Sequence, residues 1–268
     1  MSGWKWEKLW PYRAVVAVDA RDFSSLPSRG MQQVNQDIRS LLSVAMSSIG
    51  LSSSWEQRSF GQHTGDGYVA GVDPEYLPAL VGCFPGALYE LLCEHSRPDG
   101  HPLQLRVSVH VGPLPDSGLG VPMVETHRLL DDENLRRLLN RANPRFTPVA
   151  MIISERAHED VFSSGQPTGG AGPEEFEHHL VRVKAFEKSA WVHIPGLDWQ
   201  LADPKLLLPE LPTPQKTSSQ SPSVAGKDSN DVVFNNHGGE NIAQGYRMNF
   251  QHFGNQVRNI DDLRGERR

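Results

Sequence analysis

Runs of apolar residues alternate with amphipathic stretches between residues 12 and 198. The segment YRAVVAVDA, which begins at residue 12, is apolar almost without interruption up to Asp19, and this pattern is typical of a strand buried on both faces. Residues 31–46 carry apolar side chains at helical spacing on one face, which predicts an amphipathic helix. The same criteria predict further strands within residues 57–63, 68–71, 103–111, 149–154 and 179–195, and further helices at 77–92, 124–139 and 155–162.

Two local signals refine these predictions. The turn Thr64–Gly67 lies between two predicted strands, and its Asp-Gly pair offers the positive φ that a tight hairpin turn needs. Pro85 lies inside the predicted helix 77–92 and should kink or interrupt it. The order of elements predicts an α+β fold with a ferredoxin-like core, βαββαβ, followed by a C-terminal helix and hairpin.

The composition changes near Pro209, which divides the chain. Residues 12–198 form the predicted folded domain, and residues 199–230, rich in Pro, Ser and Thr, form a predicted linker. Residues 231–257 contain neither Pro nor Lys and are rich in Asn and Gln, whereas residues 258–268 are a charged end that we expect to be disordered.

Charge and hydropathy narrow the functional classes. The net charge is −6, with 26 Lys and Arg against 32 Asp and Glu, so a global basic surface for nucleic acid is not expected. The N-terminus lacks a signal-peptide core, and no apolar run reaches the 18 residues of a membrane span. These observations predict a soluble cytoplasmic protein that binds neither nucleic acid nor membrane.

Asp19 and Asp66 are the residues that most suggest chemistry. Asp19 ends the first buried strand and Asp66 lies at the hairpin tip, and in a ferredoxin-like sheet these two points are neighbours. Two close carboxylates repel unless a cation lies between them, and a pair of divalent metal ions is a common arrangement in triphosphate chemistry. The simpler alternative is that Asp66 only shapes the turn and Asp19 only caps the next helix.

The wider sequence resembles the catalytic domains of class III nucleotide cyclases. DARDFS, residues 19–24, is similar to their Asp-x-x-x-Phe-Thr/Ser signature, and Gly65-Asp66-Gly67 is similar to their Gly-Asp hairpin. The spacing from Gly120 to Arg128 is similar to that of the family's G-x-x-V-N-x-A-x-R helix. Weaker similarities are LRVSVHVG (105–112), Ile152–Glu155 and Val181–Lys184, so that the resemblance covers roughly residues 12–198.

This resemblance implies a function and a set of site residues. Asp19 and Asp66 would hold two ions of Mg²⁺ or Mn²⁺, and Arg128 would stabilise the charge that develops on the transferred phosphoryl group. The substrate would be a nucleoside triphosphate, the product a cyclic nucleotide, and the enzyme a head-to-tail homodimer. The backbone of Ala20, Arg21, Asp22 and Phe23 would cradle the phosphates, and Lys184 or Lys188 would reach the terminal phosphates.

Several positions depart from the family pattern. Val124 stands where the family has its transition-state asparagine, and Gln62 and Ser117 replace the base-selecting pair, so that the base cannot be inferred. The connection from Gly112 to Gly120 is short for an arm that closes a dimer. These departures favour an alternative function, a catalytically inactive nucleotide-binding or docking module in a signalling or defence complex, with Arg128 as an ordinary surface arginine.

The C-terminal segment carries a second resemblance. Asn241-Ile242-Ala243-Gln244-Gly245 is similar to the hydrophobic-x-Gln-Gly core of RHIM-like bacterial amyloid signalling motifs. That resemblance implies self-assembly through stacked amide side chains, and a partner that shares the motif. The alternative is a disordered tail with a fortuitous polar patch.

Overall fold

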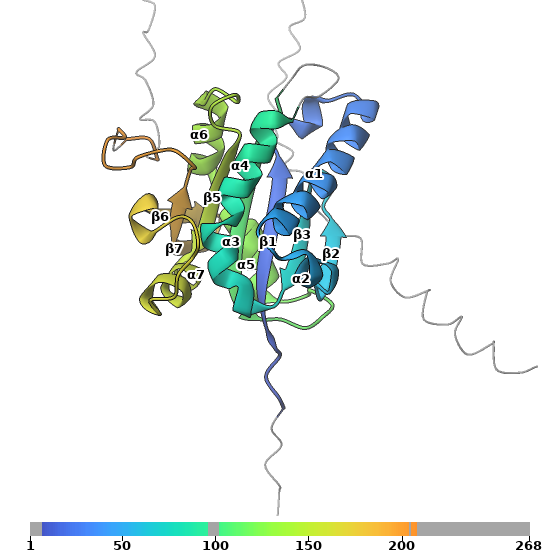
Figure 1. The fold of residues 1–268 in the computed structure, drawn as a ribbon, viewed down its shortest axis with the longest axis vertical. Coiled ribbons are helices and arrows are strands. Elements are labelled where there is room, and N and C mark those ends of the chain that lie inside the picture. The colour runs from blue at the N-terminus through green and yellow to red at the C-terminus, as the bar shows by residue number, and fades with distance from the viewer. Residues whose placement is uncertain (1–6, 96–101, 204, 208–268) are drawn as a thin grey trace, which may run out of the picture. The chain divides into compact units, whose positions relative to one another are not determined.

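The computed structural model describes residues 7–95, 102–203 and 205–207, all of which belong to the compact unit Met1–Thr213 (Figure 1). The predicted segments 231–257 and 258–268, and most of the predicted linker 199–230, lie outside the described residues. Beyond residue 198, the described chain still packs on the domain, since Trp199, Leu206 and Leu207 contact the apolar cluster around Val181.

A seven-stranded sheet with the order β2-β3-β1-β4-β5-β7-β6 forms the centre of the domain (Figure 1). Its first four strands in this order pair antiparallel, β5 runs parallel to β4, and the β6–β7 hairpin completes the sheet. The α+β class and the ferredoxin-like core predicted from the sequence are confirmed. The strands are β1 (Tyr12–Ala20), β2 (Phe60–His63), β3 (Gly67–Val72), β4 (Leu105–Pro113), β5 (Val149–Ser154), β6 (Glu177–Val183) and β7 (Phe186–His193).

Helices cover both faces of the sheet. Side chains alternate along a strand, so Ala14, Val16 and Val18 of β1 join the core under α1 and α4, whereas Val15 and Ala17 face α5. This burial on both faces explains the continuous apolar run of β1. The helices are α1 (Ser28–Ser48), α2 (Ser52–Glu56), α3 (Leu77–Gly82), α4 (Phe84–Glu94), α5 (Val121–Leu130), α6 (Glu133–Arg141) and α7 (Glu155–His158), and a π-helical turn, Glu159–Ser163, follows α7.

Two of the predicted helices are interrupted. The helix expected at 77–92 breaks at Cys83, two residues before Pro85, as predicted, and the chain bends by 50° between Pro74–Gly82 and Phe84–Glu94. The single helix expected at 124–139 is wrong, because α5 ends at Leu130 and α6 begins at Glu133. The break is stabilised by Asp132, whose carboxylate accepts the backbone N–H of Leu135 at 2.8 Å and so caps α6.

The β2–β3 hairpin forms as predicted, but its glycines act differently from the expectation. The positive φ of the turn belongs to Gly65, at 94°, and not to the Asp66-Gly67 pair. Gly67 is required for another reason: a Cβ there would overlap the carbonyl oxygen of Val18. The absent side chain lets the hairpin approach β1 closely.

Among the described residues, no single helix is both long and apolar enough to cross a membrane. The bent pair Pro74–Gly82 and Phe84–Glu94 passes that test jointly, by length and composition only.

Candidate functional site

Strand β4 presents a row of polar side chains to helix α5. Arg106, Ser108 and His110 alternate with valines that face the opposite core, and all three polar side chains are buried. The Ser108 hydroxyl donates to the carbonyl oxygen of Thr126 on α5 at 2.9 Å, and His110 Nε2 lies 3.4 Å from Glu125. Ser108 and His110 therefore each have a partner on α5, although the Nδ1 atom of His110 is buried without a hydrogen-bond partner among the described residues.

Arg106 is paired with Asp19. The two residues are direct partners across the β1–β4 ladder, and the Nε and Nη2 groups of Arg106 donate to the two carboxylate oxygens of Asp19 at 2.8 and 2.6 Å. The pKa of Asp19 is raised to about 6, mainly by burial and in part by the nearby charge of Asp66, against the opposing effect of Arg106. The remaining nitrogen of Arg106, Nη1, is buried without a hydrogen-bond partner in the described part of the chain.

Asp66 lies beside Asp19, as the sequence predicted. Gly67 is the register partner of Asp19, and the carbonyl oxygen of Asp66 accepts the backbone N–H of Ala20 at 2.9 Å. Partial burial raises the pKa of Asp66, while its own backbone N–H and the charges of Arg106 and Arg136 lower it. The two carboxylates thus share one electrostatic environment.

The backbone of residues 20–23, which the sequence predicted to bind phosphates, already forms some hydrogen bonds within the domain. The N–H groups of Ala20 and Arg21 donate to the carbonyl oxygens of Asp66 and Gln104, so the amides of Asp22 and Phe23 are the ones left for a ligand in this stretch. Asp22 adopts a left-handed conformation with φ of 57°, which turns the chain here. The Arg21 guanidinium bonds the Gln104 side chain and the Leu139 carbonyl oxygen, at 2.5 and 2.9 Å.

Among the described residues, neither Arg128 nor Lys184 forms a hydrogen bond or ion pair with Asp19 or Asp66. Arg128, half-buried on α5, is not among the charges that act on Asp19 or Asp66. Lys184 is exposed in the β6–β7 turn, with φ of 56°. Because β4 and β5 separate β1 from β7, and neighbouring strands lie about 4.8 Å apart, Lys184 is roughly 15 Å or more from Asp19.

The carboxylates of Asp19 and Asp66 suit a hard divalent cation, provided that other ligands complete its coordination. Mg²⁺ and Mn²⁺ accept carboxylate oxygens, and Mg²⁺ commonly takes only one or two carboxylates from the protein and the rest from phosphates and water. The described residues hold no cluster of three or more His, Cys, Asp or Glu side chains suited to a metal, so a ligand or water must complete the coordination. In this structure both oxygens of Asp19 already accept from Arg106, which would compete with a cation for this carboxylate.

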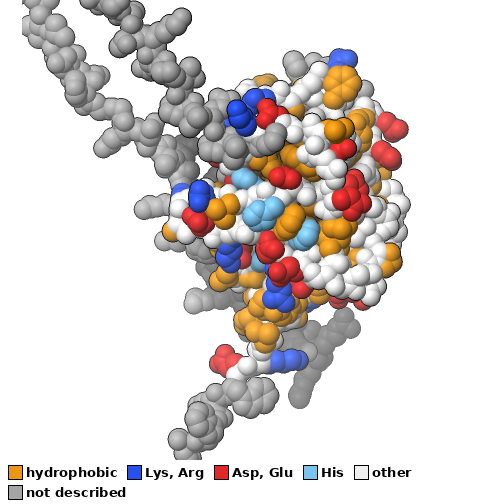
Figure 2. Space-filling model, turned by 90° about the vertical axis from the view of Figure 1, so that its left-hand side faces the viewer, with side chains coloured by type: hydrophobic (Ala, Val, Ile, Leu, Met, Phe, Trp, Pro, Cys, Tyr) orange, Lys and Arg blue, Asp and Glu red, His pale blue; other side chains and the backbone are white. Residues whose placement is uncertain are grey.

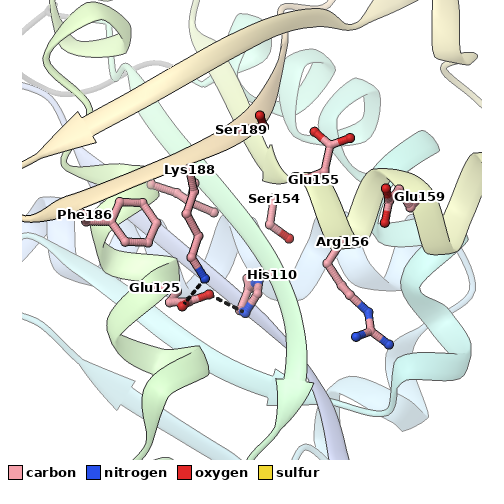
Figure 3. A pocket seen from close by; sticks show the side chains of 10 residues that line it. His110, Glu125, Ser154, Glu155, Arg156, Glu159, Phe186, Lys188 and Ser189 are labelled. Carbon is pink, nitrogen blue, oxygen red and sulfur yellow. Dashed lines mark hydrogen bonds and ion pairs between the residues drawn. The ribbon is translucent and has the colours of Figure 1, made fainter.

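A separate pocket of about 340 Å³ lies between α5, β7 and the start of α7. Figure 3 shows Lys188 and His110 both directed at Glu125, which Lys188 contacts at 2.5 Å. Lys188, which the resemblance offered as an alternative phosphate ligand, therefore holds Glu125 in this structure. Burial lowers the pKa of His110, and Glu125 opposes that shift.

Sequence reasoning missed Arg106, Arg136 and His127. Arg136 pairs with Asp131 at 2.6 Å and acts on both site carboxylates, and the charge of Asp66 acts on His127, whose pKa burial lowers. A signal for Arg106 existed, because the polar-apolar alternation of residues 105–111 places it on one face with Ser108 and His110. Only the strand register shows that it faces Asp19.

No protein-family model matches the chain, and no curated protein matches it. Solved structures with a similar chain trace include the catalytic core of a rhodopsin-guanylyl cyclase with converted specificity in complex with ATPalphaS (14% identity, 70% of this chain and 98% of that one, TM-score 0.46). A second is the guanylate cyclase domain of RhGC from Catenaria anguillulae in complex with GTP, at 12% identity over 70% of this chain and 98% of that one, with a TM-score of 0.45. A third is an adenylate/guanylate cyclase/hydrolase from Silicibacter pomeroyi, at 19% identity over 69% of this chain and 98% of that one, with a TM-score of 0.44. At these identities the likeness concerns the fold alone.

Proposed function

We propose that this domain binds a nucleoside triphosphate together with a divalent cation at Asp19 and Asp66, and that it is a nucleotide-binding module in a signalling complex. The observation that carries the proposal is that the backbones of Asp19 and Asp66 are adjacent at the junction of β1 and the β2–β3 hairpin and that the charge of Asp66 acts on Asp19. The ordered similarity of residues 12–198 to class III cyclase motifs supports the same ligand class.

The chain offers groups for each part of such a ligand. Asp19 and Asp66 would hold the cation, which supplies charge neutralisation for the phosphates. The amides of Asp22 and Phe23 and the unpartnered Nη1 of Arg106 would donate to phosphate oxygens. Val124, which is 54% exposed on α5, provides no donor where a cyclase needs one, so binding without turnover is the expected behaviour.

A second candidate function is cyclisation of the triphosphate by a homodimer. It is favoured by the exposure of Lys184 and the partial exposure of Arg128, which form no ion pair with the carboxylates of their own chain in the described residues and which a second chain would be able to contact. In that arrangement one copy would supply the carboxylates and the other would supply Arg128. The missing asparagine at Val124 predicts low turnover in this case.

Equilibrium binding of fluorescent ATP and GTP analogues in Mg²⁺ tests the proposal. The full chain should bind at least one analogue, the double variant Asp19→Asn, Asp66→Asn should lose this binding, and Asp160→Asn, an exposed helix carboxylate, should retain it. Chromatography of the same mixtures reports cyclic nucleotide. Binding without product supports the module, product that depends on Asp19 and Asp66 supports the cyclase, and equal binding by the double variant and the wild type would exclude both.

The C-terminal segment 231–257 enters this proposal as a device for assembly. Assembly of tails behind the predicted linker would raise the local concentration of the domains to about the millimolar range and bring two domains together. Thioflavin fluorescence of the full chain, compared with a chain that ends at residue 230, tests this step. Equal, low signals from both would contradict it.

A further inference from the structure

The guanidinium of Arg106 occupies the position at Asp19 that a bound cation would take. Both carboxylate oxygens of Asp19 accept from Arg106, at 2.8 and 2.6 Å, and the two side chains are only 9–10% exposed. We propose that Arg106 is an exchangeable counter-ion: it neutralises Asp19 in the free protein, and it is displaced toward the ligand's phosphates when the divalent cation binds. This inference rests on the proposed function and describes how the same site is regulated.

We expect Arg106 to be displaced because it binds the same Asp19 carboxylate that the cation would bind. A bidentate ion pair uses one lone pair on each oxygen of Asp19, so a cation would have to share the same carboxylate with Arg106 while this geometry persists. Two positive charges on one buried carboxylate would also repel each other strongly, because the surroundings screen charge poorly. Cation binding and the Asp19–Arg106 pair therefore compete for the same carboxylate.

The displaced guanidinium needs a new anion. Arg106 is 8% exposed, and its buried Nη1 has no hydrogen-bond partner within residues 7–95, 102–203 and 205–207. A buried guanidinium that loses its carboxylate is strongly destabilised unless another anion replaces it. The phosphates of the incoming ligand supply that anion, so the cation and the triphosphate should each strengthen the binding of the other.

Arg136 provides a matched comparison within the same site. Its charge acts on both Asp19 and Asp66, but it pairs with Asp131 on the helix side and contacts neither carboxylate. Loss of Arg136 removes one positive charge from the neighbourhood without opening Asp19. Loss of Arg106 removes both the charge and the competing ligand.

The wild-type full chain allows a test that needs no substitution. In ¹⁵N NMR spectra, the Nε–H signal of Arg106 should be protected by its bond to Asp19, and addition of Mg²⁺ with a non-hydrolysable triphosphate should shift or broaden it. Sodium chloride of equal ionic strength should leave the signal unchanged. A signal that stays unshifted while the triphosphate binds would overturn the inference and leave the proposed function intact.

Titration with Mn²⁺ at pH 8.0, followed by electron paramagnetic resonance, gives a second test. Arg106→Met should bind Mn²⁺ alone about tenfold or more tightly than the wild type and should bind the Mg²⁺-triphosphate more weakly. Arg136→Met should move both affinities by a smaller factor. Weakening of both by Arg106→Met would overturn the inference, whereas absence of any Mn²⁺ or triphosphate binding in all three proteins would overturn the proposed function itself.

Discussion

Asp132 and His179 form a buried hydrogen bond that joins helix α6 to strand β6, with 3.1 Å between Asp132 Oδ2 and His179 Nε2. The other oxygen of Asp132 caps α6 through the backbone N–H of Leu135. One carboxylate thus explains why the helix breaks at this point and where α6 packs. Neither residue lies among the groups of the proposed ligand site.

Asp132→Ala should lower the free energy of unfolding by about 2–4 kcal/mol, since it removes a helix cap and leaves a buried imidazole without its partner. Asp132→Asn keeps an oxygen for the cap and should lose about half as much. Urea unfolding followed by circular dichroism measures both. Glu187→Gln, which breaks the exposed pair with Arg182, is the control and should change stability by about 0.5 kcal/mol or less. A similar small loss for Asp132→Ala would show that the cap is dispensable.

Gly67→Ala should separate the hairpin from β1, because the added methyl group would overlap the Val18 carbonyl oxygen. We expect a loss of about 2–4 kcal/mol in unfolding free energy and weaker triphosphate binding, since Asp66 would move away from Asp19. Gly65→Asn is the matched comparison: it faces open space, and asparagine tolerates the positive φ at that position. Thermal unfolding and the triphosphate-binding assay measure the effects of both substitutions. Equal effects of the two would contradict the close approach of Gly67 to β1 as the cause.

Buried histidines should make the domain less stable as the pH falls. On β7, burial lowers the pKa of His193 from its ordinary value of 6.5. Figure 2 shows that further histidine side chains reach the surface on this side of the molecule. The unfolded chain then takes up the proton first, so stability is complete above pH 6.5 and is lost as the pH falls below it. Each such histidine contributes at most about 1.4 kcal/mol per pH unit.

His193→Phe isolates one of these contributions. Phenylalanine can keep the ring stacking on Phe176 but binds no proton, so the variant's unfolding free energy should depend less steeply on pH than that of the wild type. Measurement between pH 7.5 and 6 is the cleanest, because the pKa of Asp19 is raised to about 6 and its protonation favours the folded state at lower pH. Parallel pH profiles for the two proteins would count against a role for His193.

The sequence predicted the fold well because its signals are local or periodic. The apolar run of β1, the hairpin and the break near Pro85 all follow from side-chain spacing and backbone limits. The α5–α6 break escaped prediction because leucine spacing continues across Asp131-Asp132, and the cap is visible only through its bond to Leu135. The adjacency of Asp19 and Asp66 followed from topology, whereas Arg106 needed the register of β4, which no local pattern specifies.

The pocket in Figure 3 allows a last prediction, in which two substitutions act in opposite directions. Burial lowers the pKa of His110, Glu125 raises it and Lys188 lowers it. Glu125→Gln removes the negative charge 3.4 Å from the imidazole and should therefore lower the pKa of His110 further. Lys188→Met removes a positive charge and frees Glu125 from its ion pair, so the pKa of His110 should rise.

NMR titration of the His110 ring signals measures both shifts, with Lys205→Met as an unrelated charge control. Shifts of the same sign in the two variants would mean that rearrangement of the pocket, and not direct charge interaction, determines the pKa of His110.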